Sequence, residues 1–153
     1  MYRSMSSTEE QRRRVADEYR ANPIEVNRRI VEEYRSNGGK VGQLGGTSRL
    51  LLLTTKGARS GLPRTAPMMY ASDGDHLVVF ASDAGAPHHP AWYHNLVADP
   101  EVSVEVGSDR FDAAAVVATG DERERLWRLF PFPEHQEKAQ REIPVIALER
   151  RGS

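Results

Sequence analysis

Three short runs of strand-forming residues follow one another in the middle of the chain, and at most eight residues connect each run to the next. They are Leu50 to Thr55, Arg64 to Ala71 and His76 to Ser82. A parallel pair of strands needs a crossover of a dozen or more residues, so these runs have to pair antiparallel as a meander. The second connection, Ser72-Asp73-Gly74-Asp75, has the composition of a tight hairpin turn. This part of the chain is therefore confined to an antiparallel sheet.

Later segments add further expected strands and two helices. Glu101 to Val106 alternates valine with polar residues, as a half-buried strand does, and Phe111 to Ala118 is the next expected strand. Helices are expected at Ala91 to Ala98 and at Asp121 to Phe130, and a final strand at Ile143 to Leu148. So many short strands would expose unpaired edges unless the sheet closes on itself. We therefore predict a small closed or partly open barrel decorated by helices.

Two helices are expected before the sheet. Residues 8 to 20 are mostly charged helix formers, and a second helix follows Asn22 and Pro23 and ends near Asn37. We interpret residues 1–43 as an N-terminal helical segment, a solvated lid with one packing face, and residues 44–153 as the barrel domain. The thin apolar face leaves weak peripheral contact with a membrane open as an alternative.

Composition excludes several classes of function. The chain has 153 residues, a single-domain length, and a formal net charge of -1, which argues against general nucleic-acid binding. It has no cysteine, which excludes disulfides and cysteine-ligated zinc. The N-terminus does not resemble a signal peptide, and no run approaches the roughly 18 apolar residues of a membrane span. We therefore expect a cytoplasmic protein.

The histidines do not indicate a metal site. His88 and His89 are adjacent and His94 follows five residues later, but no carboxylate stands at a characteristic interval and the motif H-E-x-x-H is absent. No metal is expected. Hydrolysis by a Ser-His-Asp triad is not expected either, because the chain lacks G-x-S-x-G.

The stretch TTKGARSGLPRTAP, residues 54 to 67, gathers three cations around two glycines between two expected strands. We call its centre, residues 56–64, the basic loop. Glycine lets backbone N–H groups approach a ligand, and the guanidinium groups of Arg59 and Arg64 suit phosphate or carboxylate. The loop either binds an anion, with help from Lys56, or is an ordinary solvated hairpin.

A second stretch, FASDAGAPHHPAWYHNLVADPEV, begins where the third expected strand ends. We call residues 81–89, which are rich in alanine and glycine, the small-residue segment. A flat ligand could approach its backbone, with Trp92 and Tyr93 close by. The alternative is that the two aromatic residues only pack a helix on the barrel.

Together the two stretches resemble the deazaflavin-dependent nitroreductases and quinone reductases of actinobacteria, which use coenzyme F-420. The matching patterns are L-L-x-T-x-G-x-x-S-G-x-P-R-x-x-P, from Leu52 through Pro67, and A-S-x-x-G-A-x-x-x-P-x-W-Y-x-N-L-x-A-x-P, from Ala81 through Pro100. Arg141-Glu142-Ile143-Pro144 matches the start of the family's last strand. The resemblance covers about residues 44 to 149. It implies a mainly β fold, a split β-barrel of about six antiparallel strands with N-terminal helices.

The resemblance also implies which residues bind the cofactor, a flat ring that carries a phosphate and an oligoglutamate tail. The phosphate and tail would lie near Lys56, Arg59, Ser60 and Arg64. The ring would be lined by Pro67, Met68 and Met69, approached by the backbone of Ala81, Ser82, Gly85 and Ala86, and enclosed by Trp92 and Asn95.

The implied activity is transfer of a hydride from reduced coenzyme F-420 to a quinone-like or other conjugated or nitro acceptor. Candidate catalytic residues are Ser82, which could bind the ring or the acceptor, and Tyr93 and His135, which could orient the acceptor or supply a proton. The alternatives are a non-catalytic flavin- or deazaflavin-binding module and a split-barrel oxidase that uses FMN. The partners are then the cofactor and a small hydride acceptor, and a homodimer is left open.

Two departures from the family pattern affect these expectations. Members commonly have S-K-G-G-A where this chain has Ser82-Asp83-Ala84-Gly85-Ala86, so an acid replaces a cation near the phosphate. We expect weaker cofactor binding and predict that Asp83→Lys tightens it. The tyrosines of nitroimidazole-reducing members are missing from the stretch between Phe130 and His135, which favours quinone over nitro reduction.

Overall fold

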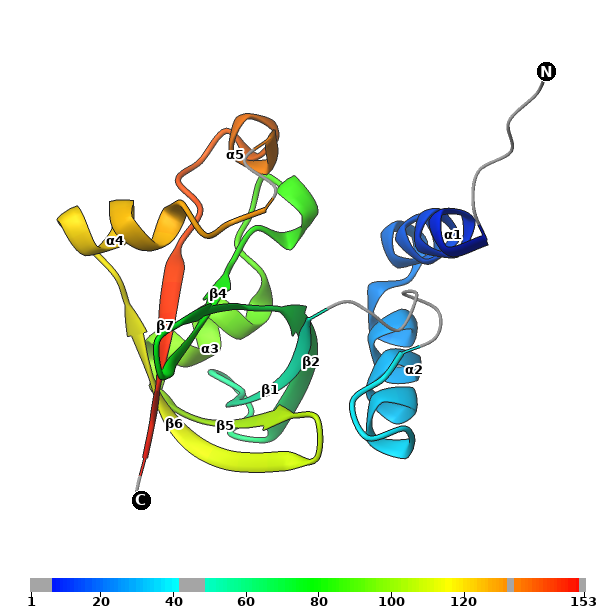
Figure 1. Cartoon of the computed structure of the whole chain (residues 1–153), viewed down its shortest axis with the longest axis horizontal. Helices are drawn as coiled ribbons and strands as arrows, with labels where there is room; N and C mark the ends of the chain where they lie inside the picture. The colour runs from blue at the N-terminus through cyan, green and yellow to red at the C-terminus, as the bar shows by residue number, and fades with distance from the viewer. Residues whose placement is uncertain (1–6, 42–48, 132–133, 152–153) are drawn as a thin grey trace.

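The computed structural model describes residues 7–41, 49–131 and 134–151. Seven strands of these residues form one antiparallel sheet in the order β2-β1-β5-β6-β7-β4-β3 (Figure 1). Their bounds are β1 Leu50–Lys56, β2 Pro63–Met69, β3 Ala71–Asp73, β4 His76–Phe80, β5 Glu101–Val106, β6 Asp109–Val117 and β7 Val145–Arg150.

The sheet curls until its two edges nearly meet. Strands β2 and β3 stand at opposite ends of the strand order, yet only Tyr70 separates them in the chain. The Tyr70 N–H donates to the carbonyl of Arg49 at 3.1 Å. The prediction of a mainly β split barrel is confirmed. The expected single strand from Arg64 to Ala71 is wrong in one respect, because the chain changes pairing partner at Tyr70, so that β2 pairs with β1 and β3 with β4.

Strand β1 is buried on both faces, which explains its run of four leucines. Leu51 and Leu53 point into the barrel, where they join the main core. Leu50 and Leu52 point outward and pack against the N-terminal helices, α1 Ser7–Ala21 and α2 Pro23–Ser36. Alternate residues of a strand face opposite sides, so a strand covered on both sides reads as continuously apolar.

The N-terminal helices lie on one side of the curled sheet, next to β1 and β2 (Figure 1). The residues that pack them there are Val15, Val26, Ile30, Tyr34 and Val41. The Tyr34 hydroxyl accepts the N–H of Gly107 at 2.7 Å and lies 3.0 Å from the Leu50 carbonyl, to which it donates. The expected packing face is therefore present. The expected domain boundary between residues 43 and 44 lies outside the described residues.

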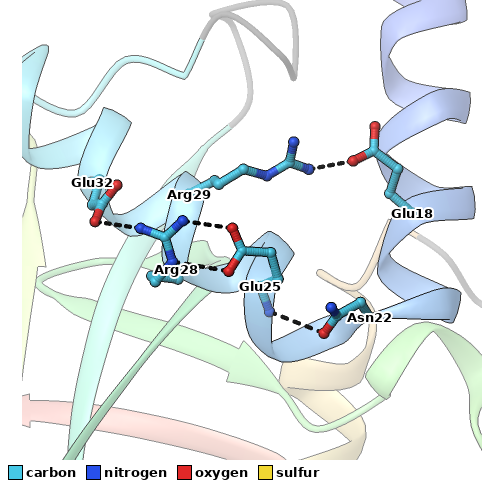
Figure 2. A network of polar contacts seen from close by, with 6 residues as sticks. All are labelled: Glu18, Asn22, Glu25, Arg28, Arg29 and Glu32. Atoms are coloured by element: carbon cyan, nitrogen blue, oxygen red, sulfur yellow. Dashed lines mark hydrogen bonds and ion pairs between the residues drawn. The ribbon is translucent and has the colours of Figure 1, made fainter.

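Exposed and partly buried ion pairs connect residues within and between the two helices (Figure 2). Arg28 of α2 binds Glu25 and Glu32 on its own helix, and Arg29 reaches back to Glu18 of α1. Exposed pairs of this kind usually contribute less than about 1 kcal/mol each. The apolar face of the helices, and not this network, holds them on the barrel.

The remaining helices are short. The expected helix α3 is confirmed at Ala91–Ala98, and α4 spans Gly120–Trp127, which is shorter than expected. A turn of 3-10 helix, η2 at Asp83–Gly85, and helix α5 at Glu134–Ala139 were not predicted, because neither has an apolar repeat of helical period. Strand β7 begins two residues later than expected, after Pro144. No helix of the described ranges is long and apolar enough to cross a membrane.

Candidate functional site

The basic loop is a compact turn at the tip of the β1–β2 hairpin. The Gly57 N–H donates to the Leu62 carbonyl and the Gly61 N–H to the Gly57 carbonyl, both at 2.8 Å. The Ser60 hydroxyl accepts the Leu62 N–H at 3.1 Å. Gly61 has a φ of +71°, a conformation that side-chain-bearing residues rarely adopt. The two glycines therefore allow the backbone conformation of the turn, and the Ser60 side chain stabilises the turn through its hydrogen bond with Leu62.

The three cations of the basic loop are exposed and form no ion pair or hydrogen bond with any other residue of the described ranges. Other arginines are paired, such as Arg35 with Glu105 and Arg125 with Asp73. A hollow of about 370 Å³ lies beside the loop. Its lining residues are Lys56, Gly57, Ala58, Arg59, Ser60, Gly61, Ala98 and Asp99. Lys56 and Arg59 line this hollow and suit an anionic group, whereas Arg64 is not among its lining residues and the Asp99 carboxylate opposes an anion.

Asn95 of α3 joins the helix to the basic loop. Its side chain is buried, and its Oδ1 accepts the N–H of Ala58 at 3.0 Å while its Nδ2 donates to the Thr55 hydroxyl at 3.1 Å. The structure therefore brings Asn95 together with the predicted phosphate-binding residues. Its amide holds the shape of the loop.

The predicted ring-lining residues lie on β2 and α3. Met68 and Trp92 are partly buried and pack against the main core, whereas Met69 is 42% exposed. Pro67 pairs with Leu52 of β1 and is half-buried. These residues form a wall of the barrel, and none of them lines the hollow of the basic loop. Trp92 and Tyr93 both pack against the main core, as expected if they hold helix α3 on the barrel.

The small-residue segment is held from the C-terminal side by Arg141. The guanidinium donates to the carbonyls of Ala81, Ser82 and Ala86, each at 3.1 Å. The Ala81 N–H donates to the Pro144 carbonyl at 3.0 Å. The backbone of Ala81 is therefore used within the protein, and the Ser82 side chain is left half-buried at the end of β4.

Helices α1 and α5 also contact the small-residue segment. The Tyr19 hydroxyl of α1 donates to the Asp83 carboxylate at 2.8 Å, and burial, reinforced by this contact, raises the pKa of Tyr19 well above its usual value. Gly85 has a φ of +83°, and a Cβ added there would lie 2.9 Å from the Lys138 Cδ of α5. The positive φ favours glycine here, and a larger residue would also have to displace the Lys138 side chain.

His89 connects the small-residue segment to α3. Its Nδ1 lies 2.8 Å from Nη1 of Arg141, and because arginine has no acceptor, Nδ1 must accept and the ring proton must be on Nε2. The ring packs on Tyr93, with centroids 4.6 Å apart, and faces His94 at 5.7 Å. Burial, followed by the charge of Arg141, lowers the pKa of His89. The hydrogen bond from Arg141 therefore requires the neutral form of His89.

The three candidate catalytic residues are not in one group. Ser82 is in the small-residue segment, and Tyr93 reaches that segment through His89. His135 of α5 packs on Phe130, with ring centroids 5.8 Å apart, in an aromatic cluster with Phe80 and Trp127. Two members of the late stretch, Phe132 and Pro133, lie outside the described residues.

Helix α3 stands between the two constellations that the sequence singles out. Its first residues lie beside His89, and its last residues, Ala98 and the following Asp99, line the hollow of the basic loop. Eight residues of α-helix span about 12 Å. The helix therefore sets how far the small-residue segment lies from the cations of the basic loop.

Sequence reasoning missed two residues that shape the site. Arg141 is quoted only as part of the family pattern, yet it binds four acceptors of the small-residue segment. Tyr19 lies in the first expected helix, residues 8 to 20, and nothing in that helix singles it out. Arg141 has a signal in the sequence, its place in the R-E-I-P match, whereas nothing local links Tyr19 to a residue 64 positions away.

Comparison with known proteins identifies a family model and a relative that have the same description. A protein-family model described as F420H(2)-dependent quinone reductase matches residues 26–150. An F420H(2)-dependent quinone reductase of Mycobacterium tuberculosis is 39% identical over 122 residues, which are 74% of this chain and 82% of that protein.

Two solved structures are similar in both sequence and fold. An F420-H2 dependent reductase has 39% identity and a TM-score of 0.61, covering 66% of this chain and 94% of its own. A structure described as a domain-swapped dimer has 36% identity and a TM-score of 0.63, covering 79% of this chain and 96% of its own.

Proposed function

The chain belongs to the F420H(2)-dependent quinone reductase family, and from this we propose that it is an oxidoreductase that transfers a hydride from reduced coenzyme F-420 to a quinone. The observation that supports the proposal beyond family membership is the set of unpaired cations of the basic loop, two of which, Lys56 and Arg59, line its hollow. The protein as a whole is nearly neutral, so these cations are a local feature. Such a feature fits a cofactor with an anionic tail.

The residues present fit the cofactor at both ends of α3. Lys56, Arg59 and Arg64 are free to contact a phosphate or carboxylates, and Ser60 and Asn95 keep the loop that carries them in shape. At the other end, the small-residue segment would receive the flat ring through its small side chains, because the backbone N–H groups of Ala81, Gly85 and Ala86 already have partners within the protein. Met68 and Trp92 supply the apolar wall between them.

The cofactor, when bound, supplies the hydride chemistry. The protein's own contribution is to bind the ring in a defined orientation, keep water from it and hold the acceptor next to it. We assign Ser82 and Tyr93 to the acceptor side, because both are half-buried beside the small-residue segment and each carries a hydroxyl. His135 belongs to the same proposal as a proton source, on the strength of its place on α5, which packs on η2.

A binding titration followed by turnover tests the proposal. The purified chain is titrated with coenzyme F-420 and, separately, with FMN, and the reduced deazaflavin is then offered menadione as a generic quinone and a nitroimidazole. We expect tighter binding of coenzyme F-420 and faster oxidation by the quinone than by the nitro compound. Tighter binding of FMN would favour the split-barrel oxidase, and binding without turnover would favour the non-catalytic module.

The assembly and the location of the protein belong to the same proposal. We expect a homodimer, since one similar structure is a domain-swapped dimer, and light scattering on the purified chain measures the mass directly. We expect a cytoplasmic protein with at most peripheral membrane contact, through the exposed Arg13 and Arg14 of α1 and the 83% exposed Ile24. Co-sedimentation with anionic vesicles at low and high salt measures that contact.

A further inference from the structure

Arg141 uses nearly all of its hydrogen-bonding capacity on one segment of the chain. A guanidinium carries five N–H donors, and four of them are directed at the small-residue segment. Nε donates to the Ala86 carbonyl, Nη2 to the carbonyls of Ala81 and Ser82, and Nη1 to Nδ1 of His89 at 2.8 Å. An arginine committed in this way is not available as a direct ligand of an anion. Its effect is on the shape of the segment.

One residue on each side of this contact has an unfavourable backbone conformation. Asp83 has a φ of +46° and Gln140 a φ of +54°, and in the described ranges no other residue except glycine has a positive φ. Asp83 lies within the small-residue segment, and Gln140 immediately precedes Arg141. Left-handed conformations of such residues cost free energy and persist only where the surroundings impose them. The bonds made by Arg141 link the two positions, because they join the turn that follows Gln140 to the segment that contains Asp83.

We propose that Arg141 is a positioning residue, which holds the small-residue segment in the conformation that receives the flat ring of the cofactor. This inference rests on the proposed function. If the segment is released, only a fraction of the molecules is competent to bind, and the apparent Kd rises by the reciprocal of that fraction. Saturating cofactor selects the competent form again. Loss of the contact should therefore raise Kd and the KM for the cofactor and leave kcat nearly unchanged.

Arg123 provides a matched control. It is also an arginine that holds a backbone carbonyl near the same turn, because its Nη2 donates to Ile143 at 2.8 Å. Its side chain is 13% exposed and lies 5.1 Å from the Trp127 ring centroid. No bond to the small-residue segment is found for Arg123 among the residues the structure describes. Arg123→Lys should therefore cost stability without changing that segment.

The experiment compares the full chain with Arg141→Lys, Arg141→Gln and Arg123→Lys. Lysine keeps the positive charge at position 141 but cannot reach four acceptors with one ammonium group. Three quantities are measured: the Kd for coenzyme F-420 by fluorescence, the KM and kcat with menadione at saturation, and amide hydrogen exchange of residues 81–89 without cofactor. Measurements are made well below the melting temperature of each variant, so that folded protein is compared.

For both Arg141 variants we expect the Kd and the cofactor KM to rise about tenfold, with kcat within about twofold of the wild type, and exchange in residues 81–89 to become faster. Arg123→Lys should lower the melting temperature alone. The inference is overturned if Arg141→Lys matches the wild type in Kd and in exchange, or if Arg123→Lys changes both as strongly. If the wild-type chain does not bind coenzyme F-420, the proposed function itself is wrong. The titration of the wild type alone distinguishes this outcome from a failure of the inference about Arg141.

Discussion

Arg64 is the residue whose role the structure sharpens most. It stands in the second position of β2, opposite Thr55, so its backbone is fixed by the hairpin while its side chain is exposed. No other residue of the described ranges binds its guanidinium. A cation held on a rigid strand without a partner is better placed to bind an anion than one on a mobile tip.

We expect Arg64→Ala to weaken binding of coenzyme F-420 by roughly 1.5 to 3 kcal/mol, the usual scale for a hydrogen bond to a charged group. The melting temperature of the cofactor-free chain should hardly change, because among the described residues the guanidinium has no hydrogen bond or ion pair to lose. Arg64→Lys should weaken binding more than Lys56→Arg does, since only the first change loses a two-pronged contact. Arg128→Ala, at an exposed arginine after α4, serves as the control. Unchanged affinity together with a large loss of stability would make Arg64 a structural residue.

At the scale of elements, the contact between α1 and η2 gives Asp83 a structural role. The carboxylate accepts the Tyr19 hydroxyl and lies 3.7 Å from Nε2 of His88. An acid in place of the family's cation thus ties the N-terminal helix to the small-residue segment. Replacing Asp83 by lysine removes a negative charge and this tie at once, so a second variant is needed to separate the two effects.

Asp83→Asn removes the charge but keeps a side-chain oxygen for Tyr19, and asparagine tolerates a positive φ. We expect Asp83→Asn to tighten binding of the anionic cofactor at low salt and to leave α1 protected from hydrogen exchange. Asp83→Lys should tighten binding further, an effect that shrinks as salt screens it, while exchange in α1 becomes faster. The measurements are Kd at two ionic strengths and exchange in residues 7–21. Equal Kd values for all three chains at low salt would show that Asp83 does not sense the cofactor.

For the molecule as a whole, His89 makes stability depend on pH. Burial and Arg141 lower its pKa, so the unfolded chain takes up a proton near the ordinary pKa of about 6.5 while the folded chain does not. The groups that face the ring are Arg141, His94 and Tyr93, and Asp83 lies beyond His88. Where the unfolded state binds more protons, stability rises with pH. The contribution of His89 to the free energy of unfolding is therefore complete above pH 6.5. It is lost as the pH falls through the pKa that His89 has in the folded chain.

We expect the free energy of unfolding, measured by urea titration between pH 5 and 7.5, to fall toward the acid end. The fall should be smaller in His89→Asn, which cannot titrate at this position. If His89→Asn shows the same slope as the wild type, the bond from Arg141 does not depend on a neutral imidazole.

Local chemistry was enough to predict the antiparallel meander, the hairpin that carries the basic loop, helix α3 and the packing face of the N-terminal helices. In each case the signal is short-range, a period of two, a turn composition or a helical stripe, and the physical preference acts over the same few residues. The family pattern added the split barrel and the cofactor. It did so because R-E-I-P and the two longer motifs stand in fixed order along the chain.

The tertiary structure alone decided which distant residues meet. Arg141 lies 52 to 60 residues from the four groups it binds, and Tyr19 lies 64 residues from Asp83. No local preference in the sequence encodes such a pairing, because it exists only after the sheet has curled and β4 and β7 have been brought side by side. Leu50 to Leu53 show the same limit. The run is apolar enough for any buried strand, but only the fold reveals that alternate leucines face two different cores.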